Sequence, residues 1–157
     1  MRIDICHHYD ASPATVHAML ADPAFWQFVL EGQTQTLEVG AVPDGVSMKL
    51  GVRAPSQVRP ITGETLVFVL TATWQLGDDG VWAGPIVIDA GKLPGSFSGT
   101  TTVGPDGAGA QVTYSGDFTI KVPLIGKTIE QKAVPYATGA LNGQQAKGIE
   151  WLATHTY

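Results

Sequence analysis

Apolar and polar residues alternate along most of the chain, a pattern typical of β-strands with one buried face. The first alternating segment runs from Arg2 to Tyr9 and places Ile3, Ile5, His7 and Tyr9 on one face. Later segments show the same period, and turn sequences rich in Gly, Asp and Pro separate several of them, as in hairpins. We therefore predict seven antiparallel strands, at residues 2–9, 35–42, 46–53, 66–75, 82–89, 97–103 and 111–122.

Two short helices are predicted between the first strand and the second. Ser12 can accept hydrogen bonds from the free amides of a helix start, and Pro13 occupies the first helical position, where its missing N–H costs nothing. Asp22 and Pro23 repeat this signal directly before an aromatic segment. The chain therefore predicts two helix starts in close succession.

A third, much longer helix is predicted from Pro123 to about Ala153, where apolar residues recur with a period near 3.6. Pro135 lies inside it and cannot donate the helical hydrogen bond, so we expect a kink near residues 131–135. That kink has two interpretations, a distortion that tertiary packing tolerates or a compliant lid over a cavity. The predicted inward stripe consists of Ile125, Ile129, Ala133, Tyr136, Ala140 and Gln144.

The clearest alternating segments indicate which side chains of the sheet face inward. Residues two apart along a strand point to the same side, so each segment yields one mainly apolar set. The first set is Leu66, Phe68, Leu70, Ala72 and Trp74, and the second is Val112, Tyr114, Gly116, Phe118 and Ile120. We expect both sets to border the space between the sheet and the long helix.

Composition favours one domain over residues 1–157 and excludes several classes of function. Hydrophobic residues make up 44% of the 157 positions and charged residues only 15%, which argues against disorder. Nine basic and 14 acidic residues give a net charge of −5, and no basic run is present, so nucleic-acid binding is disfavoured. No apolar stretch approaches the roughly 20 residues of a membrane-spanning helix, so no integral membrane insertion is expected.

The cysteine count and the N-terminal residues favour a cytoplasmic location. Cys6 is the single cysteine, so it has no partner for an intrachain disulfide. The acidic Asp4 stands where a secretion signal has an apolar run of about 7–15 residues. Both features are typical of proteins of a reducing compartment.

The histidines do not predict a metal site, and no cofactor is predicted. His7 and His8 are neighbours in a strand, so their side chains leave on opposite faces and cannot ligate one ion together. His17 and His155 have no Cys, Asp or Glu partner at helical spacing. His7 lies on the apolar face, where we expect an interior histidine with satisfied hydrogen bonds; the alternative is contact with a ligand or proton transfer.

The order of strand, two short helices, six strands and a long C-terminal helix resembles the helix-grip fold of the START-like (SRPBCC) superfamily. That superfamily includes polyketide cyclases, lipid-transfer START domains and the birch-pollen allergen. The stretch HHYDASPATVHAMLADPAFW, residues 7–26, resembles its first strand and helix pair. The stretch GDFTIKVPLIGKTIEQ, residues 116–131, resembles its last strand, Val-Pro turn and the start of the gripping helix. The closest likeness is to an actinobacterial START-like family of unknown function.

The resemblance implies an α+β fold in which a hydrophobic cavity lies between a curved antiparallel sheet and the long helix. Catalytic residues are not shared across the superfamily, so none is carried over. We expect a protein that binds a small hydrophobic molecule or a lipid there, with polar groups among an apolar lining. The candidate cavity residues are His7, Tyr9, Phe68, Trp74, Tyr114, Phe118, Ile129, Tyr136, Ala140 and Gln144.

Two other functions stay open at this stage. An enzyme of the polyketide cyclase or hydrolase kind would use a tyrosine or histidine of the cavity, and it predicts a hydrogen-bonded His7–tyrosine or tyrosine–carboxylate pair. An interaction module would bind a protein or a membrane surface through the aromatic residues of the second helix, Phe25, Trp26 and Phe28. The sequence does not predict an oligomeric state.

Overall fold

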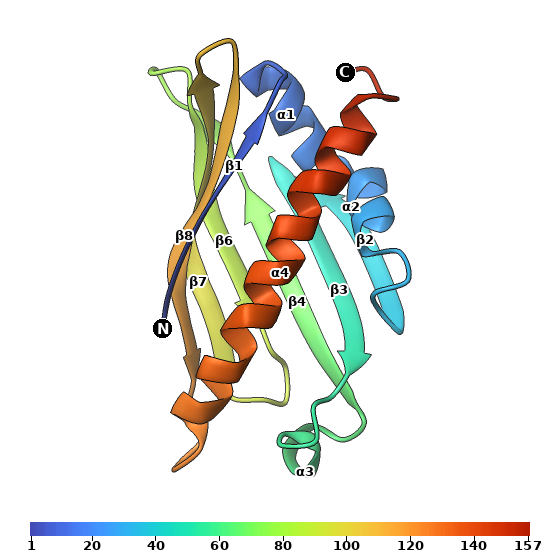
Figure 1. The fold of residues 1–157 in the computed structure, drawn as a ribbon, viewed down its shortest axis with the longest axis vertical. Helices are drawn as coiled ribbons and strands as arrows, with labels where there is room; N and C mark the ends of the chain where they lie inside the picture. Colours follow the sequence, from blue (N-terminus) through green and yellow to red (C-terminus); the bar gives the residue numbers. More distant parts are fainter.

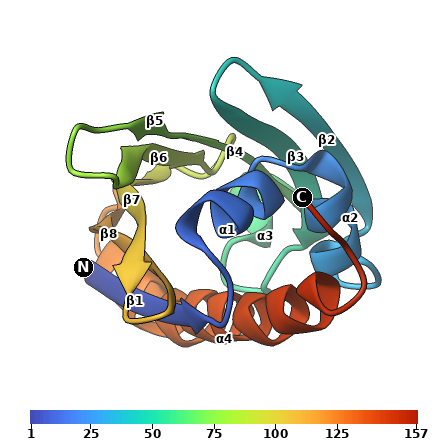
Figure 2. The same ribbon diagram turned by 90° about the horizontal axis from the view of Figure 1, so that it is seen from above.

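A curved antiparallel sheet holds one long helix, α4, across its concave face in the computed structural model (Figure 1). The model describes residues 1–157, except for the side chains of Val134, Tyr136 and Ala137. The strands are hydrogen-bonded in the order β1-β8-β7-β6-β4-β3-β2, and β5 pairs with β6. Seen from above, sheet and α4 form a ring around α1, and α2 lies beside the C-terminal end of α4 (Figure 2). The α+β helix-grip architecture is confirmed.

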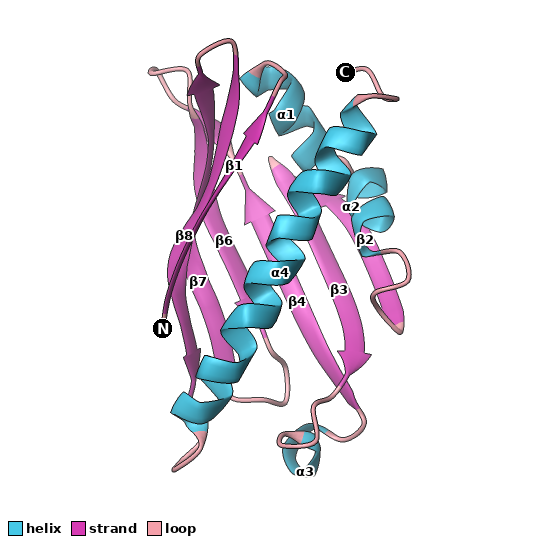
Figure 3. Ribbon diagram, in the orientation of Figure 1, coloured by secondary structure: helices cyan, strands magenta, loops and turns pink.

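Eight strands and four helices follow one another along the described chain, and Figure 3 separates the two kinds of element. The strands are β1 (Arg2–Tyr9), β2 (Thr36–Val42), β3 (Gly45–Arg53), β4 (Thr65–Thr73), β5 (Gln75–Leu76), β6 (Trp82–Asp89), β7 (Gly95–Asp106) and β8 (Gly109–Ile120). The helices are α1 (Pro13–Leu20), α2 (Pro23–Leu30), α3 (Arg59–Thr62) and α4 (Gly126–Leu152). None of these helices is long and apolar enough to cross a membrane.

The two short helices begin where the sequence predicts. Ser12 accepts a hydrogen bond from the Thr15 amide at 3.2 Å, and Pro13 follows at the first helical position. Asp22 caps α2 in the same way through the Ala24 amide, at 2.9 Å. These caps satisfy amides that have no partner within the helix, so each start is fixed locally.

Three strand segments differ most from the prediction, and one of them is β8, which was predicted at 111–122 and spans 109–120. The predicted strand 66–75 is divided into β4 and β5, because the Trp74 amide between them donates to the Asp44 carbonyl in the β2–β3 turn at 2.8 Å. β7 begins two residues before and ends three residues after the predicted 97–103, since it pairs with the whole of β8. The short helix α3 was not predicted, because four residues carry too little periodicity to reveal a helix.

The long helix α4 continues through Pro135 and spans 27 residues, about 40 Å at 1.5 Å per residue. It rests mainly on β1 and β8 at one side of the sheet and on α2 at the other. Two positions of the predicted inward stripe differ, because Ile125 precedes the helix and is exposed, as is Ala140. The inward position of Tyr136 lies outside the described side chains, and the kink at 131–135 stays a prediction.

The buried apolar residues form two clusters of unequal size. The main cluster joins α1, α2 and the C-terminal end of α4 to the inner face of the sheet, and Phe25, Met19, Leu20 and Val112 are fully buried in it. The lower cluster lies at the end of the molecule that carries α3, at the bottom of Figure 1. It consists of Ala54, Val58, Leu66, Ala90, Leu93 and Ile120.

Candidate functional site

A polar cluster lies inside the molecule, where β1, β8 and α4 meet. It consists of His7 and Tyr9 from β1, Tyr114 from β8 and Gln144 from α4. Each of these side chains is exposed by 3% or less. Gln144 Nε2 donates a hydrogen bond to the Tyr114 hydroxyl oxygen at 2.7 Å. The fold thus brings four of the ten candidate residues together.

The register of β1 against β8 explains how these residues meet. Ile5 lies directly opposite Tyr114 and His7 opposite Val112, so His7 and Tyr114 are diagonal neighbours on the inner face. The His7 ring meets the Tyr114 ring edge-on, with 5.6 Å between centroids, and the Tyr9 ring edge-on at 6.4 Å. The alternation of residues along β1 is therefore sufficient to predict that His7 and Tyr9, two of the four cluster residues, point to the inner face.

Gly148 allows α4 to approach this cluster, and the sequence did not indicate that role. A Cβ atom at position 148 would lie 2.7 Å from Cε1 and 2.9 Å from the hydroxyl of Tyr9. A Cβ atom at Gly139 or Gly143 would meet nothing within 4 Å, whereas one at Gly126 would be forced against the Ile120 carbonyl oxygen, so close contact explains two of the four glycines of α4. A glycine in a helix signals a contact of this kind only when the partner is known.

Four polar atoms of the cluster have no hydrogen-bond partner among the described residues. They are both ring nitrogens of His7, the Tyr9 hydroxyl and Oε1 of Gln144. Buried polar atoms are nearly always paired, since an unpaired one costs about 1–3 kcal/mol. The expectation that His7 has satisfied hydrogen bonds is therefore wrong, and the geometry favours its alternative, contact with a ligand.

Burial keeps the titratable groups of this cluster neutral. It lowers the pKa of His7, and the neighbouring His8 lowers it further. Burial raises the pKa of Tyr114 to about 12, against the opposing hydrogen bond with Gln144, and it also raises the pKa of Tyr9. At neutral pH the cluster therefore offers uncharged donors and acceptors rather than an ion.

An apolar row crosses the sheet next to the polar cluster. Leu70, Ile88 and Phe118 project from β4, β6 and β8, and each remains partly exposed although α4 passes over this face (Figure 1). The row is continuous because its members are paired in register, in the order Met48, Leu70, Ile88, Phe97 and Phe118. Leu70, Ile88 and Phe118 therefore keep some solvent-accessible surface, whereas Met48 and Phe97 of the same row are buried.

The remaining candidate residues do not belong to the polar cluster, and several of them pack in or against the two apolar clusters. Phe68 and Ile129 are half-buried against the lower cluster, and Phe118 contacts both clusters. Trp74 is buried in the main cluster, where its Nε1 donates to Thr101 Oγ1 at 3.3 Å. Ala140 is exposed, and the Tyr136 side chain lies outside the described part of the chain.

A second aromatic group surrounds His17, and sequence reasoning missed it. The His17 ring stacks on Trp82 at 4.9 Å between centroids and meets Trp74 edge-on at 5.8 Å. Burial lowers the pKa of His17, while Asp44 acts in the opposite direction. Among the described residues no group of three or more His, Cys, Asp or Glu side chains could hold a metal ion.

The hydrogen-bonded pair that an enzyme would require is not formed within the polar cluster; the tyrosine–carboxylate pair of Tyr157 and Asp22, at 2.7 Å, lies outside it. Tyr114 is paired with the Gln144 amide instead of a carboxylate, and His7 meets two tyrosine rings without a hydrogen bond. The cluster therefore offers hydrogen bonds to a polar group but no preformed acid–base pair.

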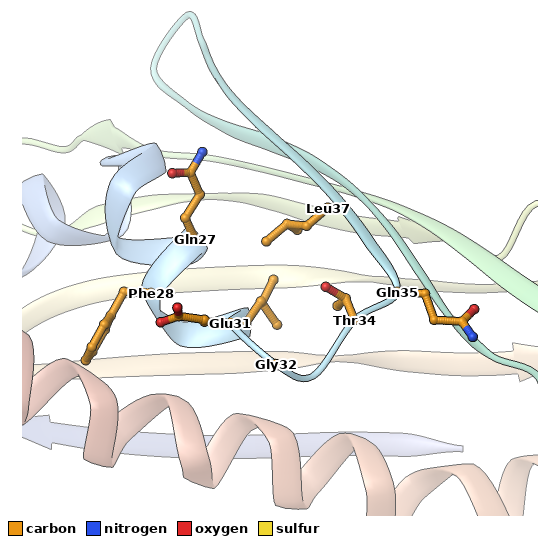
Figure 4. Close-up of a pocket in the computed structure, with 8 residues that line it drawn as sticks. Gln27, Phe28, Glu31, Gly32, Thr34, Gln35 and Leu37 are labelled. Atoms are coloured by element: carbon orange, nitrogen blue, oxygen red, sulfur yellow. The ribbon is translucent and has the colours of Figure 1, made fainter.

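A surface pocket of about 480 Å³ lies where α2 ends and β2 begins. Phe28, Glu31 and Leu37 line it, and Figure 4 shows them on either side of the connecting loop. The preceding aromatic residues of α2, Phe25 and Trp26, are buried in the main cluster. Two of the three residues of the predicted interaction surface are therefore buried, and Phe28 stays partly exposed.

Comparisons with solved structures support the same fold at low sequence identity. An aromatase/cyclase from Streptomyces sp. R1128 has a TM-score of 0.64 and 14% identity, with 99% of each chain covered. A START superfamily protein from Mycobacterium smegmatis has a TM-score of 0.61 and 16% identity, covering 96% of this chain and 98% of its own. A STAR-related lipid transfer protein from Xanthomonas axonopodis has a TM-score of 0.58 and 22% identity, with coverages of 94% and 84%.

The chain has the helix-grip fold that these START-like structures share. It belongs to a family of proteins of unknown function (DUF2505), whose family model matches residues 4–152. No curated protein matches the chain. The helix-grip fold expected from the sequence resemblance is confirmed.

Proposed function

We propose that this protein binds a small, mainly apolar molecule that carries one uncharged polar group, between the sheet and α4. The observation that carries the proposal is the set of buried, unpaired polar atoms on His7, Tyr9 and Gln144. These atoms would gain partners from a hydroxyl or carbonyl group of the ligand. Their neutral state favours such a group over an ion.

The apolar part of the ligand would lie on the row of Leu70, Ile88 and Phe118. Tyr114 and Phe118 share the inner face of β8 and are four residues apart, about 13 Å along a strand. A molecule of that length can reach both the polar cluster and the apolar row. The names of structural neighbours, which include a lipid transfer protein and an aromatase/cyclase, agree with a ligand of this chemical class.

Binding at the inner face can be tested with two adjacent residues of β4. Leu70 points inward and is half-buried, whereas Val69 points to the outer face. Leu70→Trp fills the proposed binding space, so it should weaken binding of the uncharged fluorescent probe N-phenyl-1-naphthylamine about tenfold or more, whereas Val69→Trp should not change it. Circular dichroism verifies that both variants fold.

A second matched pair lies on β6, in case Leu70→Trp does not fold. Ile88→Phe adds volume on the inner face, and Val87→Phe adds it on the outer face. Equal probe binding by all folded variants and the unaltered protein would contradict the proposed site. Native mass spectrometry with organic extraction would then identify any molecule that copurifies and its chemical class.

The polar group of the ligand can be tested by comparing 1-naphthol with naphthalene. Naphthalene is the more apolar of the two, so a preference for 1-naphthol requires hydrogen bonding in the site. Replacing the unpaired group in His7→Leu should reduce that preference about tenfold. A protein that prefers naphthalene would contradict the assigned role of the cluster.

The cytoplasmic location and an actinobacterial source remain expectations from the sequence. A single cysteine, Cys6, supports the first, because its exposed thiol persists in a reducing compartment. Cell fractionation of the native host tests it directly.

A further inference from the structure

Three loops form one surface at the lower end of the molecule, which we name the lower rim. The loops span residues 53–64, 89–95 and 121–127, and Figures 1 and 3 show them below the sheet. The Lys121 amide donates to the Pro94 carbonyl at 2.7 Å, which joins two of the loops. The lower cluster contains residues of the first two loops, and Val122 of the third packs against it, so this packing fixes the relative positions of the loops.

The lower rim exposes three large apolar side chains to solvent. Leu124 is fully exposed, and Ile125 and Ile61 are exposed by 41% and 40%. Leu124 also has a φ of +70°, a conformation that disfavours a side chain with a Cβ atom. A polar residue would remove the apolar exposure, and a glycine would remove the backbone strain. Folding stability therefore does not account for a leucine at this position.

The same surface carries most of the positive charge of the protein. Five of the nine basic residues lie in its loops, namely Arg53, Arg59, Lys92, Lys121 and Lys127. Glu64 and Asp89 are its only acidic residues, whereas the whole chain has a net charge of −5. The lower rim is therefore positive on a protein that is otherwise strongly acidic.

Exposed apolar residues elsewhere lack this combination. Leu76, exposed by 58%, is next to a hairpin that carries Asp78 and Asp79. Val69 and Val87 are isolated side chains on the outer face of the sheet. Only the lower rim, among the described residues, joins exposed apolar side chains to clustered cations, which is the chemistry of a surface complementary to anionic lipid.

We propose that the lower rim docks on an anionic lipid bilayer. Leu124 and Ile125 would enter the boundary between headgroups and acyl chains, and Lys121 and Lys127 on either side of them would contact lipid phosphates and carboxylates. This interaction is independent of the proposed ligand site, because none of these side chains belongs to the polar cluster or the apolar row.

Sedimentation with lipid vesicles tests the proposal directly. The protein should bind vesicles that contain phosphatidylserine more tightly than vesicles of phosphatidylcholine alone. The difference should shrink as salt increases, since ions screen the attraction. Leu124→Ser should weaken binding about tenfold, because one leucine no longer enters the bilayer. Lys121→Glu combined with Lys127→Glu should weaken it further.

Matched controls lie on the far side of the molecule. Leu76→Ser removes an exposed leucine from an acidic surface, and Lys49→Glu reverses an exposed charge on β3, so neither should change vesicle binding. All five substituted positions are exposed, so the variants should fold. Absence of binding to phosphatidylserine vesicles, or equal loss with the control variants, overturns the proposal. Neither result affects the probe titration, so the ligand site is judged separately.

Discussion

The main cluster and the lower cluster differ in how completely they exclude solvent. In the main cluster α1 and α2 fill the upper end of the grip, and residues such as Phe25 and Met19 are fully buried. The lower cluster is small, and its neighbours Phe68 and Ile129 keep exposed surface. The difference indicates that the upper end, closed by α1 and α2, contributes most of the buried apolar surface, while partly exposed side chains such as Leu70 and Phe68 lie farther along the sheet.

The largest expected effect tests this difference with two phenylalanines. Phe25→Ala should lower the free energy of unfolding by about 3–5 kcal/mol, because it leaves a cavity among the rings of Trp26 and Trp151. Phe68→Ala should cost no more than about 2 kcal/mol, since that side chain is already partly solvated. Urea unfolding followed by circular dichroism measures both values.

Equal losses at the two positions would mean that the lower end is as tightly packed as the upper. Val69→Ala, an outer-face substitution next to Phe68, serves as the control and should cost less than about 1 kcal/mol. A loss at Phe68 that matches the loss at Phe25 would remove the structural basis for a binding space at this end.

The part of the upper end that the sequence predicted best comprises β1 and the starts of α1 and α2. Local signals determine it: Ser12 and Asp22 cap helices through their own neighbours, and β1 alternates from Ile3 to Tyr9. The division at Trp74 was missed because it depends on a hydrogen bond to Asp44, thirty residues earlier in the sequence. Long-range contacts of that kind leave no periodic signal.

A second prediction compares two glycines of α4. Gly148→Ala should lower the free energy of unfolding by about 1–3 kcal/mol, because the new Cβ would be forced against the buried Tyr9 ring. Gly143→Ala should instead raise it by up to about 1 kcal/mol, since that position is open and alanine favours the helix. Thermal or urea unfolding measures the change in the free energy of unfolding for both variants. The same sign for both variants would show that α4 is not held close to β1.

The sequence predicted which residues form the polar cluster, but not whether their polar atoms are hydrogen-bonded. Alternation placed His7, Tyr9 and Tyr114 on one inner face, and helical spacing added Gln144. Whether the ring nitrogens of His7 find partners depends on side-chain directions from three separate elements, which no local pattern encodes. For that reason the sequence favoured a satisfied histidine and the structure shows an unpaired one.

A third prediction concerns the pH dependence of stability in the buried region. Burial lowers the pKa of His7 below its ordinary value of 6.5, so the unfolded chain binds a proton that the folded chain does not. The free energy of unfolding should therefore be constant above pH 6.5 and fall as the pH drops below it. One such proton gives at most about 1.4 kcal/mol per pH unit.

The variant His7→Gln should flatten this acid-side slope, as measured by urea unfolding between neutral pH and pH 5. His17, whose pKa is lowered for the same reason, should contribute in the same direction, so the double variant with His17→Gln should be flatter still. An unchanged slope in His7→Gln would show that the pKa of this histidine does not differ between the folded and the unfolded chain.

The smallest expected effect on the free energy of unfolding is at the lower rim, where a substitution should raise it instead of lowering it. Leu124 adopts a left-handed backbone conformation that is unfavourable for leucine, and its side chain is fully exposed. Leu124→Gly removes this strain, but glycine also makes the unfolded chain more flexible, which lowers stability. The net gain in the free energy of unfolding should be below about 1 kcal/mol. Ile125→Gly is the control, because the φ of Ile125, −117°, is already ordinary and glycine only adds entropy to the unfolded chain.

The two outcomes at Leu124 have different meanings. If Leu124→Gly is more stable than the unaltered protein and binds phosphatidylserine vesicles less well, the leucine lowers stability but serves binding. If Leu124→Gly is less stable, the strain argument for this position is wrong.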